Sequence, residues 1–276
     1  MLELPGAGRS SPPSRGRSHN RYARAVGPLN GTNAVVTGAT SGLGRAMAAA
    51  LTGAGARVAV TSRSRARAQA TAGELGPTAV GVELDVRHEA SVEECSEEVY
   101  ARFGGVDLLV NNAGIGMRTV NPRFLSDPQP FWEVSPSGFH DVIETKLAGV
   151  FLVARAIVPR MLEAGAGRIV NISMNTQTMT RRGFVPYGPA GAGIEALSRV
   201  MAVDLAGTGV SVNMLLPGGA TATGMVPDEL STEVRASLLD PSIMGPPIVW
   251  LASPDAKGVH DQRIVASEFD HWLMQR

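Results

Sequence analysis

A glycine-rich run early in the chain has the residue types of an anion-binding turn. Residues 34–37 are apolar or β-branched, and they lead into Gly38-Ala39-Thr40-Ser41-Gly42-Leu43-Gly44 and then an alanine-rich stretch. Glycines at a strand-to-helix turn let the backbone approach a pyrophosphate, and the helix N-terminus offers free N–H groups and a positive dipole. A plain strand-to-helix turn also needs glycine, which is the alternative. The run predicts a phosphate cradle of six residues: Gly38, Thr40, Ser41, Gly42, Leu43 and Gly44.

The residues after the second apolar run indicate which dinucleotide this cradle would hold. An acidic residue about 20 positions past the glycines bonds a ribose 2′-hydroxyl, whereas an arginine there accommodates a 2′-phosphate. The chain reads Thr61-Ser62-Arg63-Ser64 at this place, with no carboxylate. Arg63 therefore favours the phosphorylated cofactor, NADP(H). The alternative is a solvated arginine at a helix start.

Polar and small residues also follow the third and fourth predicted strands. Asp85-Val86 ends the third strand, and Asn111-Asn112-Ala113-Gly114 follows the fourth. Ligands bind at the carboxyl ends of strands in open α/β sheets. We therefore add five residues to the candidate cofactor site: Asp85, Val86, Asn112, Ala113 and Gly114.

A parallel sheet would bring these residues to one edge, and the body of the chain has the matching pattern. From Leu29 onward, short apolar runs alternate with longer helical patterns, as in βαβ units. The predicted strands are 34–37, 58–61, 79–84, 108–110, 168–172, 210–214 and 264–265; the predicted helices are 42–52, 66–74, 91–103, 137–163, 189–206, 232–239 and 243–251. Near-continuous apolar strands suit a sheet covered on both faces. We expect one α/β domain over 29–276, with a doubly wound parallel sheet.

Composition narrows the function classes. The chain has 276 residues, of which 44% are hydrophobic and 18% charged, so it can fill a core. Its 25 basic and 25 acidic residues cancel, which gives no support for a nucleic-acid partner. A single Cys95 excludes an intrachain disulfide framework, and the scattered histidines offer no metal cluster. Only two of the basic residues are lysines, Lys146 and Lys257.

The N-terminal stretch differs from the body. Residues 1–28 are rich in Arg, Ser, Pro and Gly, and such a segment cannot bury enough apolar surface to offset chain entropy. We expect a disordered tail, with a targeting or nucleic-acid arm as the alternative. It has no apolar run of the secretory type, and no later stretch approaches about 18 apolar residues. We therefore expect a cytoplasmic protein with no membrane partner.

Five motifs resemble, in order and spacing, those of the short-chain dehydrogenase/reductase family. They are Thr37–Gly44, Asp85-Val86, Asn111–Gly114, Tyr187 at a helix start, and Pro217-Gly218 after the sixth predicted strand. The resemblance covers residues 31–267 and implies a Rossmann-like domain, a nicotinamide cofactor and a homodimer or homotetramer. It also implies that Pro217, Gly218 and Thr221 belong to the cofactor site, with Thr221 at the place that touches the nicotinamide carboxamide. For Thr221 the alternative is ordinary turn chemistry.

The resemblance further implies a reaction centre of four residues: an Asn, a Ser, and a Tyr and Lys four positions apart. The tyrosine exchanges the hydroxyl proton while hydride moves, the lysine ammonium stabilises the phenolate, and the serine bonds the substrate oxygen. Tyr187 is present, but the lysine position is Gly191. The serine position is Met174 and the asparagine position is Lys146. Ser173, one residue earlier, should face the opposite side unless a bulge intervenes.

Two hypotheses account for these replacements. In one, the site has decayed and the cofactor fold remains for stability. In the other, Lys146 supplies the missing charge, because in the family its helix packs beside the tyrosine helix and its ammonium could enter the space left by Gly191. The candidate catalytic residues are Tyr187, Lys146 and Ser173.

The expected function is NADP(H)-dependent interconversion of a carbonyl and a hydroxyl on a small to medium, partly apolar molecule. The alternative is a non-redox protein on the same fold, either a cofactor-binding module or a site reused for proton transfer or cyclisation. Fold resemblance cannot choose between them, because function lies in the site. An insertion, 116–139, precedes the Lys146 helix, and its aromatics either shape the substrate entrance or form a lid core or subunit contact.

Overall fold

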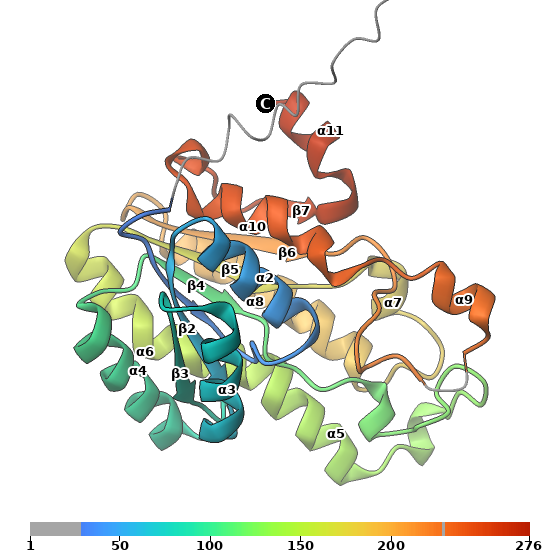
Figure 1. The fold of residues 1–276 in the computed structure, drawn as a ribbon. Coiled ribbons are helices and arrows are strands. Elements are labelled where there is room, and N and C mark those ends of the chain that lie inside the picture. Colours follow the sequence, from blue (N-terminus) through green and yellow to red (C-terminus); the bar gives the residue numbers. More distant parts are fainter. Residues whose placement is uncertain (1–28, 228–229) are drawn as a thin grey trace, which may run out of the picture.

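The computed structural model describes residues 29–227 and 230–276 (Figure 1). The predicted tail, 1–28, lies outside the described residues, so its disorder stays a prediction. Within the described ranges, seven strands form one parallel sheet in the order β3-β2-β1-β4-β5-β6-β7. Their bounds are Asn33–Val36 (β1), Arg57–Ser62 (β2), Ala79–Glu83 (β3), Leu108–Asn111 (β4), Gly167–Ile172 (β5), Val210–Leu216 (β6) and Arg263–Val265 (β7).

The direction in which successive strands are added reverses at β1, which pairs with β2 on one side and β4 on the other. At such a switch point the loops that follow the strands part, and ligands bind outside the carboxyl ends. Val35, Ala59 and Leu109 of the central strands are completely or almost completely buried. The fold is therefore the Rossmann-like α/β sheet that the sequence predicts.

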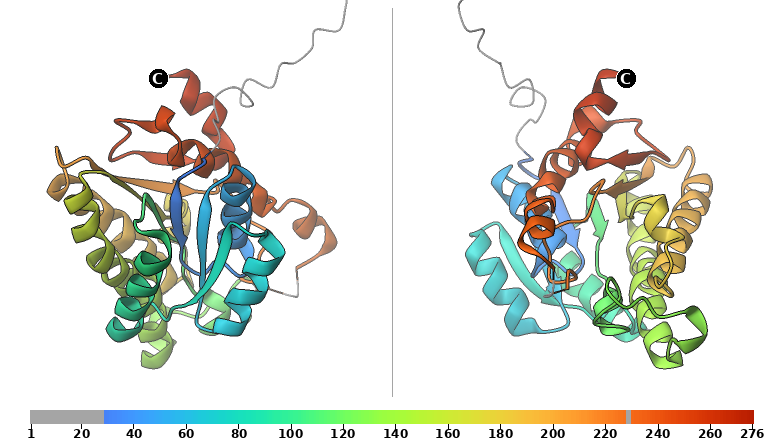
Figure 2. Two further views of the ribbon diagram at one scale, coloured as in Figure 1. Left: turned by 60° about the vertical axis from the view of Figure 1, so that its left-hand side comes forward. Right: turned by 90° about the vertical axis from the view of Figure 1, so that its right-hand side faces the viewer.

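Helices cover both faces of the sheet (Figures 1 and 2). On one face lie α2 (Gly42–Gly53), α3 (Arg65–Leu75) and α10 (Gly245–Ala252), and on the other lie α4 (Glu89–Phe103), α6 (Gly149–Ala164) and α8 (Tyr187–Asp204). Each layer closes its own apolar core, the first around Leu51 and Trp250, the second around Val99 and Ile157. None of the helices in the described ranges is long and apolar enough to cross a membrane.

The predicted helix 137–163 is present, but it contains a wider turn. It consists of α5 (Pro136–Ile143), a π-helical turn (Glu144–Ala148) and α6. Ser135 caps its start, since its hydroxyl accepts a hydrogen bond from the N–H of Gly138 at 3.1 Å. Such π turns occur often at functional sites, and Lys146 lies in the middle of this one.

Short elements account for most differences from the predicted pattern. The structure adds α7 (Thr176–Met179) and α11 (Phe269–Met274), which the periodicity does not predict, and α9 (Thr232–Ala236) ends earlier than expected. The insertion 116–139 carries two single 3₁₀ turns, Met117–Thr119 and Phe131–Glu133. Isolated turns of this length have too few periodic positions to be recognised in a sequence.

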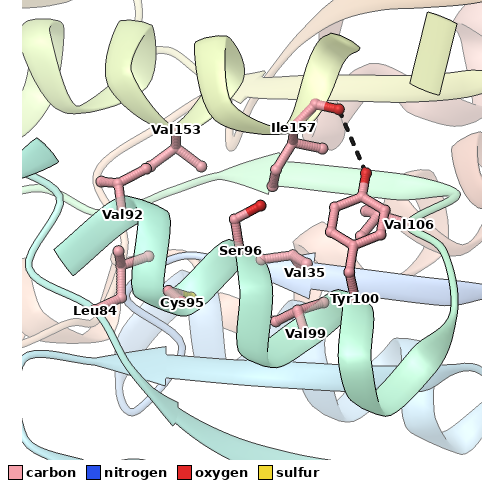
Figure 3. Close-up of a pocket in the computed structure, with 10 residues that line it drawn as sticks. All are labelled: Val35, Leu84, Val92, Cys95, Ser96, Val99, Tyr100, Val106, Val153 and Ile157. Atoms are coloured by element: carbon pink, nitrogen blue, oxygen red, sulfur yellow. Dashed lines mark hydrogen bonds between the residues drawn. The ribbon is translucent and has the colours of Figure 1, made fainter. Parts of the chain in front are cut away.

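A small cavity between α4, α6 and the sheet is a packing feature (Figure 3). Its volume is about 10 Å³, barely enough for one water molecule, and its lining is almost entirely apolar. Cys95 lies on its wall, where burial raises the pKa of the thiol to about 12. A thiol in this state is a poor nucleophile at neutral pH, so neither the cavity nor Cys95 marks a functional site.

Candidate active site

The glycine turn between β1 and α2 is folded tightly against the loop after β4. Gly38 has φ +63°, and a Cβ on it would lie 2.9 Å from the Cα of Ala113. A Cβ on Gly44 would lie 2.4 Å from the Asn112 side-chain nitrogen. Ser41 precedes α2 in an extended conformation and makes no side-chain cap. The first N–H groups of the helix are thus left for an anion, which is the geometry that a dinucleotide pyrophosphate needs.

Thr37 and Asn112 hold this turn in place. The Thr37 hydroxyl accepts hydrogen bonds from the backbone N–H groups of Asn112 and Ala113, both at 2.9 Å. The Asn112 side-chain amide donates in return to the carbonyl oxygens of Thr37 and Gly38, at 2.9 and 3.2 Å. These reciprocal bonds join the two predicted motifs at one edge of the sheet.

The segment after β6 covers the other side of the turn. A Cβ on Gly42, at φ +53°, would lie 3.2 Å from the methyl carbon of Thr223. Gly218 has φ +96°, and its carbonyl accepts a hydrogen bond from the Asn175 amide at 3.0 Å. Thr221 is buried and donates to the carbonyl of Gly219 at 3.2 Å. Pro217, Gly218 and Thr221 therefore lie in a segment that lines the predicted cofactor edge, and their contacts with a cofactor stay predictions.

Arg118 clamps this segment from the insertion. Its guanidinium donates to the carbonyl oxygens of Gly224 and Val226, at 3.2 and 2.9 Å. The sequence places Arg118 in the insertion but does not predict this contact, because nothing local distinguishes a clamping arginine from a solvated one. The contact ties the loop after β4 to the loop after β6 beside the glycine turn.

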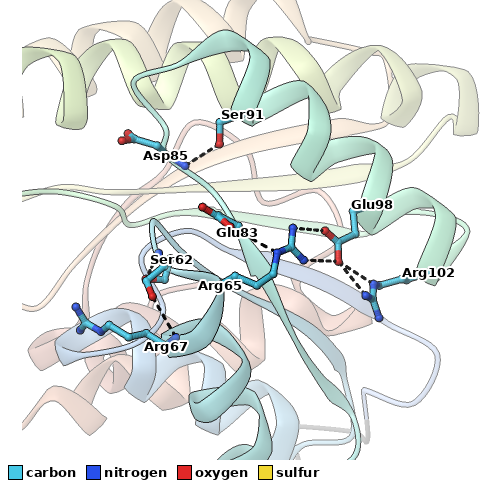
Figure 4. A network of polar contacts seen from close by, with 9 residues as sticks. Ser62, Arg65, Arg67, Glu83, Asp85, Ser91, Glu98 and Arg102 are labelled. Carbon is cyan, nitrogen blue, oxygen red and sulfur yellow. Dashed lines mark hydrogen bonds and ion pairs between the residues drawn. The ribbon is translucent and has the colours of Figure 1, made fainter.

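Arg63, just past β2, is exposed, and its side chain makes no hydrogen bond or ion pair with the residues that the structure describes. Its neighbour Arg65 is engaged (Figure 4): it lies between Glu83 and Glu98, with N–O distances of 3.5 and 3.1 Å. Arg102 binds the same Glu98 at 2.9 Å. At this position the guanidinium of Arg63 can turn to a ligand, whereas that of Arg65 is engaged.

Asp85 and Val86 lie at the carboxyl end of β3, as expected. Two hydrogen bonds from the Arg87 guanidinium, at 2.9 and 2.7 Å, hold the pKa of the Asp85 carboxyl below its usual value. The Val86 side chain is buried against the start of α6, where a Cβ on Gly149 would lie 2.6 Å from it. Both side chains thus have protein partners, and their cofactor contacts remain predictions.

Tyr187 and Lys146 meet across two helices. The Lys146 ammonium lies 4.7 Å from the centroid of the Tyr187 ring, in a cation–π contact. Lys146 is only 8% exposed, and burial lowers the pKa of its ammonium to about 8. Burial also raises the pKa of the Tyr187 hydroxyl. The cation predicted near Tyr187 is therefore present, and it comes from the helix that carries the π turn.

The space beside Gly191 is filled by Met174, and the predicted entry of Lys146 into it is wrong. A Cβ on Gly191 would lie 2.5 Å from the Met174 methyl carbon and 2.7 Å from its sulfur. Lys146 instead extends along Gly114, where a Cβ would lie 3.2 Å from its Cγ and 3.4 Å from its Nζ. The flexible, unbranched methionine suits an irregular gap of this kind.

Ser173 lies apart from this pair. Its hydroxyl donates to Glu195, which also accepts a hydrogen bond from Arg263 at 2.8 Å. Arg263 donates in turn to the carbonyl of Met174 at 2.9 Å. Glu195 is two helical turns beyond Tyr187, about 12 Å along α8. The serine thus belongs to a polar link between β5, α8 and β7; a catalytic role for it stays a prediction, and this contact gives it no support.

The insertion packs directly on the tyrosine. Met117, Phe124 and Phe184 form a small apolar cluster against which Tyr187 lies. Phe124 meets Phe184 edge to face at 5.4 Å, and Phe184 meets Tyr187 at 6.5 Å. Phe124 is thus buried in an apolar cluster, whereas Phe131 and Trp132 stay 67% and 72% exposed. Whether the aromatics of the insertion serve as substrate entrance, lid core or subunit contact stays a prediction. Across the described residues, no cluster of three or more metal-ligating side chains occurs.

Comparison with known proteins decides the family. The family model for short chain dehydrogenases matches residues 32–234. The chain belongs to the short-chain dehydrogenase family. It is 37% identical over 211 residues to the 3-oxoacyl-[acyl-carrier-protein] reductase FabG of Escherichia coli, covering 76% of this chain and 82% of the relative. It is 36% identical over 192 residues to D-threitol dehydrogenase of Mycolicibacterium smegmatis, covering 68% of this chain and 70% of the relative.

A solved structure of the family has the same architecture. The 3-ketoacyl-(acyl-carrier-protein) reductase of Brucella melitensis complexed with NADH superposes with a TM-score of 0.76 at 30% identity, over 86% of this chain and 97% of that one. As a short-chain dehydrogenase, this protein is an oxidoreductase by family. The tight glycine turn, the free start of α2 and the strand edge beside Tyr187 fit a nicotinamide dinucleotide.

Proposed function

We propose that this short-chain dehydrogenase is an NADPH-dependent oxidoreductase that interconverts a carbonyl and a hydroxyl through an atypical active site. One observation carries the proposal: the Lys146 ammonium lies 4.7 Å from the ring centroid of Tyr187. An acid with a stabilising cation is what carbonyl reduction requires of the protein. The positions usually given to Ser, Lys and Asn hold Met174, Gly191 and Lys146.

The roles of the two residues follow from their protonation. Tyr187 is protonated at neutral pH, because burial raises its pKa, so it donates its hydroxyl proton to the substrate oxygen during reduction. Protonated Lys146 then stabilises the phenolate that remains. A bound nicotinamide would supply or accept the hydride.

The cofactor would be held by the motifs at the carboxyl edge. The glycine turn would hold the pyrophosphate, the Asn112–Gly114 and Pro217–Thr221 segments would flank the nicotinamide half, and Arg63 would bind a 2′-phosphate. Arg63 supports NADPH because it is exposed and its neighbour Arg65 is committed to Glu83 and Glu98.

The substrate class that we propose is a 3-oxoacyl compound, a small to medium carbonyl molecule with an apolar chain. The names of the FabG relatives support it, and so does Met174, which replaces a polar serine by an apolar side chain next to the reaction centre. Tyr187 would then donate a hydrogen bond to the substrate oxygen without help from a serine. The reaction should therefore be slower than in a site that has both donors.

We also propose that the protein forms a homodimer or homotetramer and acts in the cytoplasm. Exposed apolar side chains on α6 and α8 support a second copy as the partner: Phe151 is 49% exposed, Val200 57% and Val203 76%. Analytical ultracentrifugation tests the assembly, since a Val203→Asp variant should shift the population toward monomers.

The alternative function is a non-redox protein on this fold, either a cofactor-binding module or a site for proton transfer or cyclisation. The Met174–Gly191 packing favours it, because an apolar side chain fills the place of the cofactor-binding lysine. One experiment separates the two functions. The purified protein is titrated with NADPH and NADH, and turnover of ethyl acetoacetate is measured beside Tyr187→Phe and the triple variant Met174→Ser, Gly191→Lys, Lys146→Asn.

We expect the unmodified protein to bind NADPH and to reduce the ketone, and Tyr187→Phe to lose about 10²–10⁴-fold in turnover. Loss of turnover with unchanged NADPH binding would locate the defect in proton transfer. Turnover that occurs only in the triple variant would mean that the natural site is not a reductase.

A further inference from the structure

Lys146 is a buried amine without a counter-ion. Its side chain is 8% exposed, and its ammonium makes no hydrogen bond or salt bridge with the residues that the structure describes. An ammonium in such a place is costly, so burial makes the side chain give up its proton at a lower pH than a solvent-exposed lysine would. Buried lysines with this tendency serve as bases and as imine-forming nucleophiles in enzymes.

The surroundings of Lys146 keep it in this state. Its Nζ is near the backbone at Gly114 and faces the ring of Tyr187, which is the titratable group of α8 in contact with it. The carboxylates of α5 and of the π turn, Asp141 and Glu144, are exposed. Arg87, which precedes α4, lies 3.8 Å from Asp141, and two ion pairs join α4 to α6: Arg155 with Glu89 and Arg160 with Glu97.

Burial lowers the pKa of Lys146 to about 8, so that at pH 8 Lys146 is a free amine in about half of the molecules. An ordinary lysine, with a pKa of ~10.4, is less than about 1% free amine at that pH. The π turn fixes the position of this amine beside a protonated tyrosine. An amine nucleophile and an acid are thus within one site.

We infer that Lys146 is a carbonyl-binding nucleophile, whose amine condenses with an aldehyde or ketone placed beside Tyr187 to form an imine. The inference rests on the proposed function in one respect, namely that the ligand of this site is a carbonyl compound. It adds a covalent activity that needs no nicotinamide.

The condensation balances as follows. The Nζ lone pair forms a bond to the carbonyl carbon, and the carbonyl π electrons move to the oxygen, which takes the Tyr187 proton. The nitrogen returns one proton to the phenolate, which leaves a neutral carbinolamine. Tyr187 then protonates the hydroxyl, the C–O bond breaks with loss of one water, and the nitrogen lone pair forms the C=N bond. The nitrogen proton returns to Tyr187.

The chain provides its own control for this chemistry. Lys257 is the second lysine, and it is exposed on the loop before β7. Peptide mapping therefore has to distinguish three amines: those of Lys146 and Lys257 and the N-terminal amine. Lys257→Arg removes the control lysine, whereas Lys146→Arg keeps a cation in the site without a nucleophilic amine.

The experiment traps the imine in the full chain without any nicotinamide. The protein is incubated with ethyl acetoacetate and sodium cyanoborohydride at pH 8, and its intact mass and peptides are measured. Reduction of the imine leaves a secondary amine, so the chain should gain the mass of the ester less one oxygen atom. In the unmodified protein we expect about tenfold more label on Lys146 than on Lys257. The Lys257→Arg variant should carry the same label on Lys146, and the Lys146→Arg variant should carry no label at position 146.

A pH series on the unmodified protein makes the test independent of variant folding. Label on Lys146 should reach its half-maximum near pH 8. Equal labelling of the two lysines, or equal total label in Lys146→Arg and the unmodified chain, overturns the inference. NADPH-dependent turnover is measured separately: turnover without trapping refutes the covalent activity alone, whereas trapping without turnover refutes the proposed reductase alone.

Discussion

The side chain of Met174 occupies the volume that a side chain at position 191 would need. A Cβ on Gly191 would lie 2.5 Å from the Met174 Cε, so each of the two residues restricts the other. A side chain larger than that of glycine at position 191 therefore requires Met174 to move or to be smaller.

The first prediction concerns this pair. Gly191→Lys alone should destabilise the protein by about 1–3 kcal/mol, since it overfills the site. Met174→Ser together with Gly191→Lys should recover most of that loss, because the methionine no longer blocks the new side chain. Urea unfolding of both single variants and the double variant gives the coupling free energy. A coupling free energy near zero would contradict the prediction, because it would show that Met174 can move aside for the new side chain without a loss of stability.

The second prediction concerns stability and pH. The folded-state pKa of Lys146, about 8, is below its unfolded value, so the unfolded chain binds the extra proton between the two values. The contribution of Lys146 to stability therefore rises as pH increases from about 8 to 10.5, and Lys146→Met should stabilise the protein at pH 7 by about 1–3 kcal/mol.

The measurement for Lys146 is the difference between variant and unmodified protein at each pH. Cys95 has the opposite effect: because its pKa is raised in the folded state, its contribution to stability falls as the pH increases above the pKa of the unfolded chain. Both proteins contain Cys95, so its contribution cancels when the two free energies of unfolding are subtracted. The stabilisation by Lys146→Met should shrink toward pH 10. A constant difference from pH 6 to 10 would contradict the shifted pKa.

The third prediction concerns cofactor choice. Arg63→Ala should weaken NADPH binding about 10–100-fold, the equivalent of one or two charge-assisted hydrogen bonds, and leave NADH binding unchanged. Fluorescence titration measures both dissociation constants. Arg65→Ala is the matched control, because Arg65 is engaged with Glu83 and Glu98. If the two variants lose NADPH affinity equally, Arg63 does not select the phosphate.

The fourth prediction concerns the Arg118 clamp. Arg118→Ala removes two hydrogen bonds to the segment after β6, so amide exchange in residues 222–227 should accelerate and the Kd for NADPH should rise about tenfold. Arg123→Ala is the control in the same insertion, since Arg123 pairs with Asp127 at the surface. Hydrogen exchange followed by mass spectrometry measures the exchange rates of residues 222–227. Equal rates in the Arg118→Ala and Arg123→Ala variants would show that Arg118 does not hold this segment.

The sheet and the glycine turn could be predicted from sequence because their signals are local. A buried strand, a glycine turn and a helix follow one another without interruption at residues 33–53. The approach of Lys146 to Tyr187 could be predicted from the position of Lys146 in the family pattern. The rotamer of Met174 could not, because it depends on packing between a strand end and a helix far apart in the chain. The Glu195 partner of Ser173 was hidden for the same reason.

The π turn at Glu144–Ala148 is in effect a one-residue insertion inside a helix that otherwise continues from Pro136 to Ala164. Removing one residue would close it into an α turn and rotate everything on its N-terminal side by about 100° about the helix axis. The insertion that packs on Tyr187 would turn with it. The segment from Pro136 to Ala164 should therefore tolerate substitutions better than deletions. Variants of different length should retain the fold when the change in length lies in the loop before Pro136.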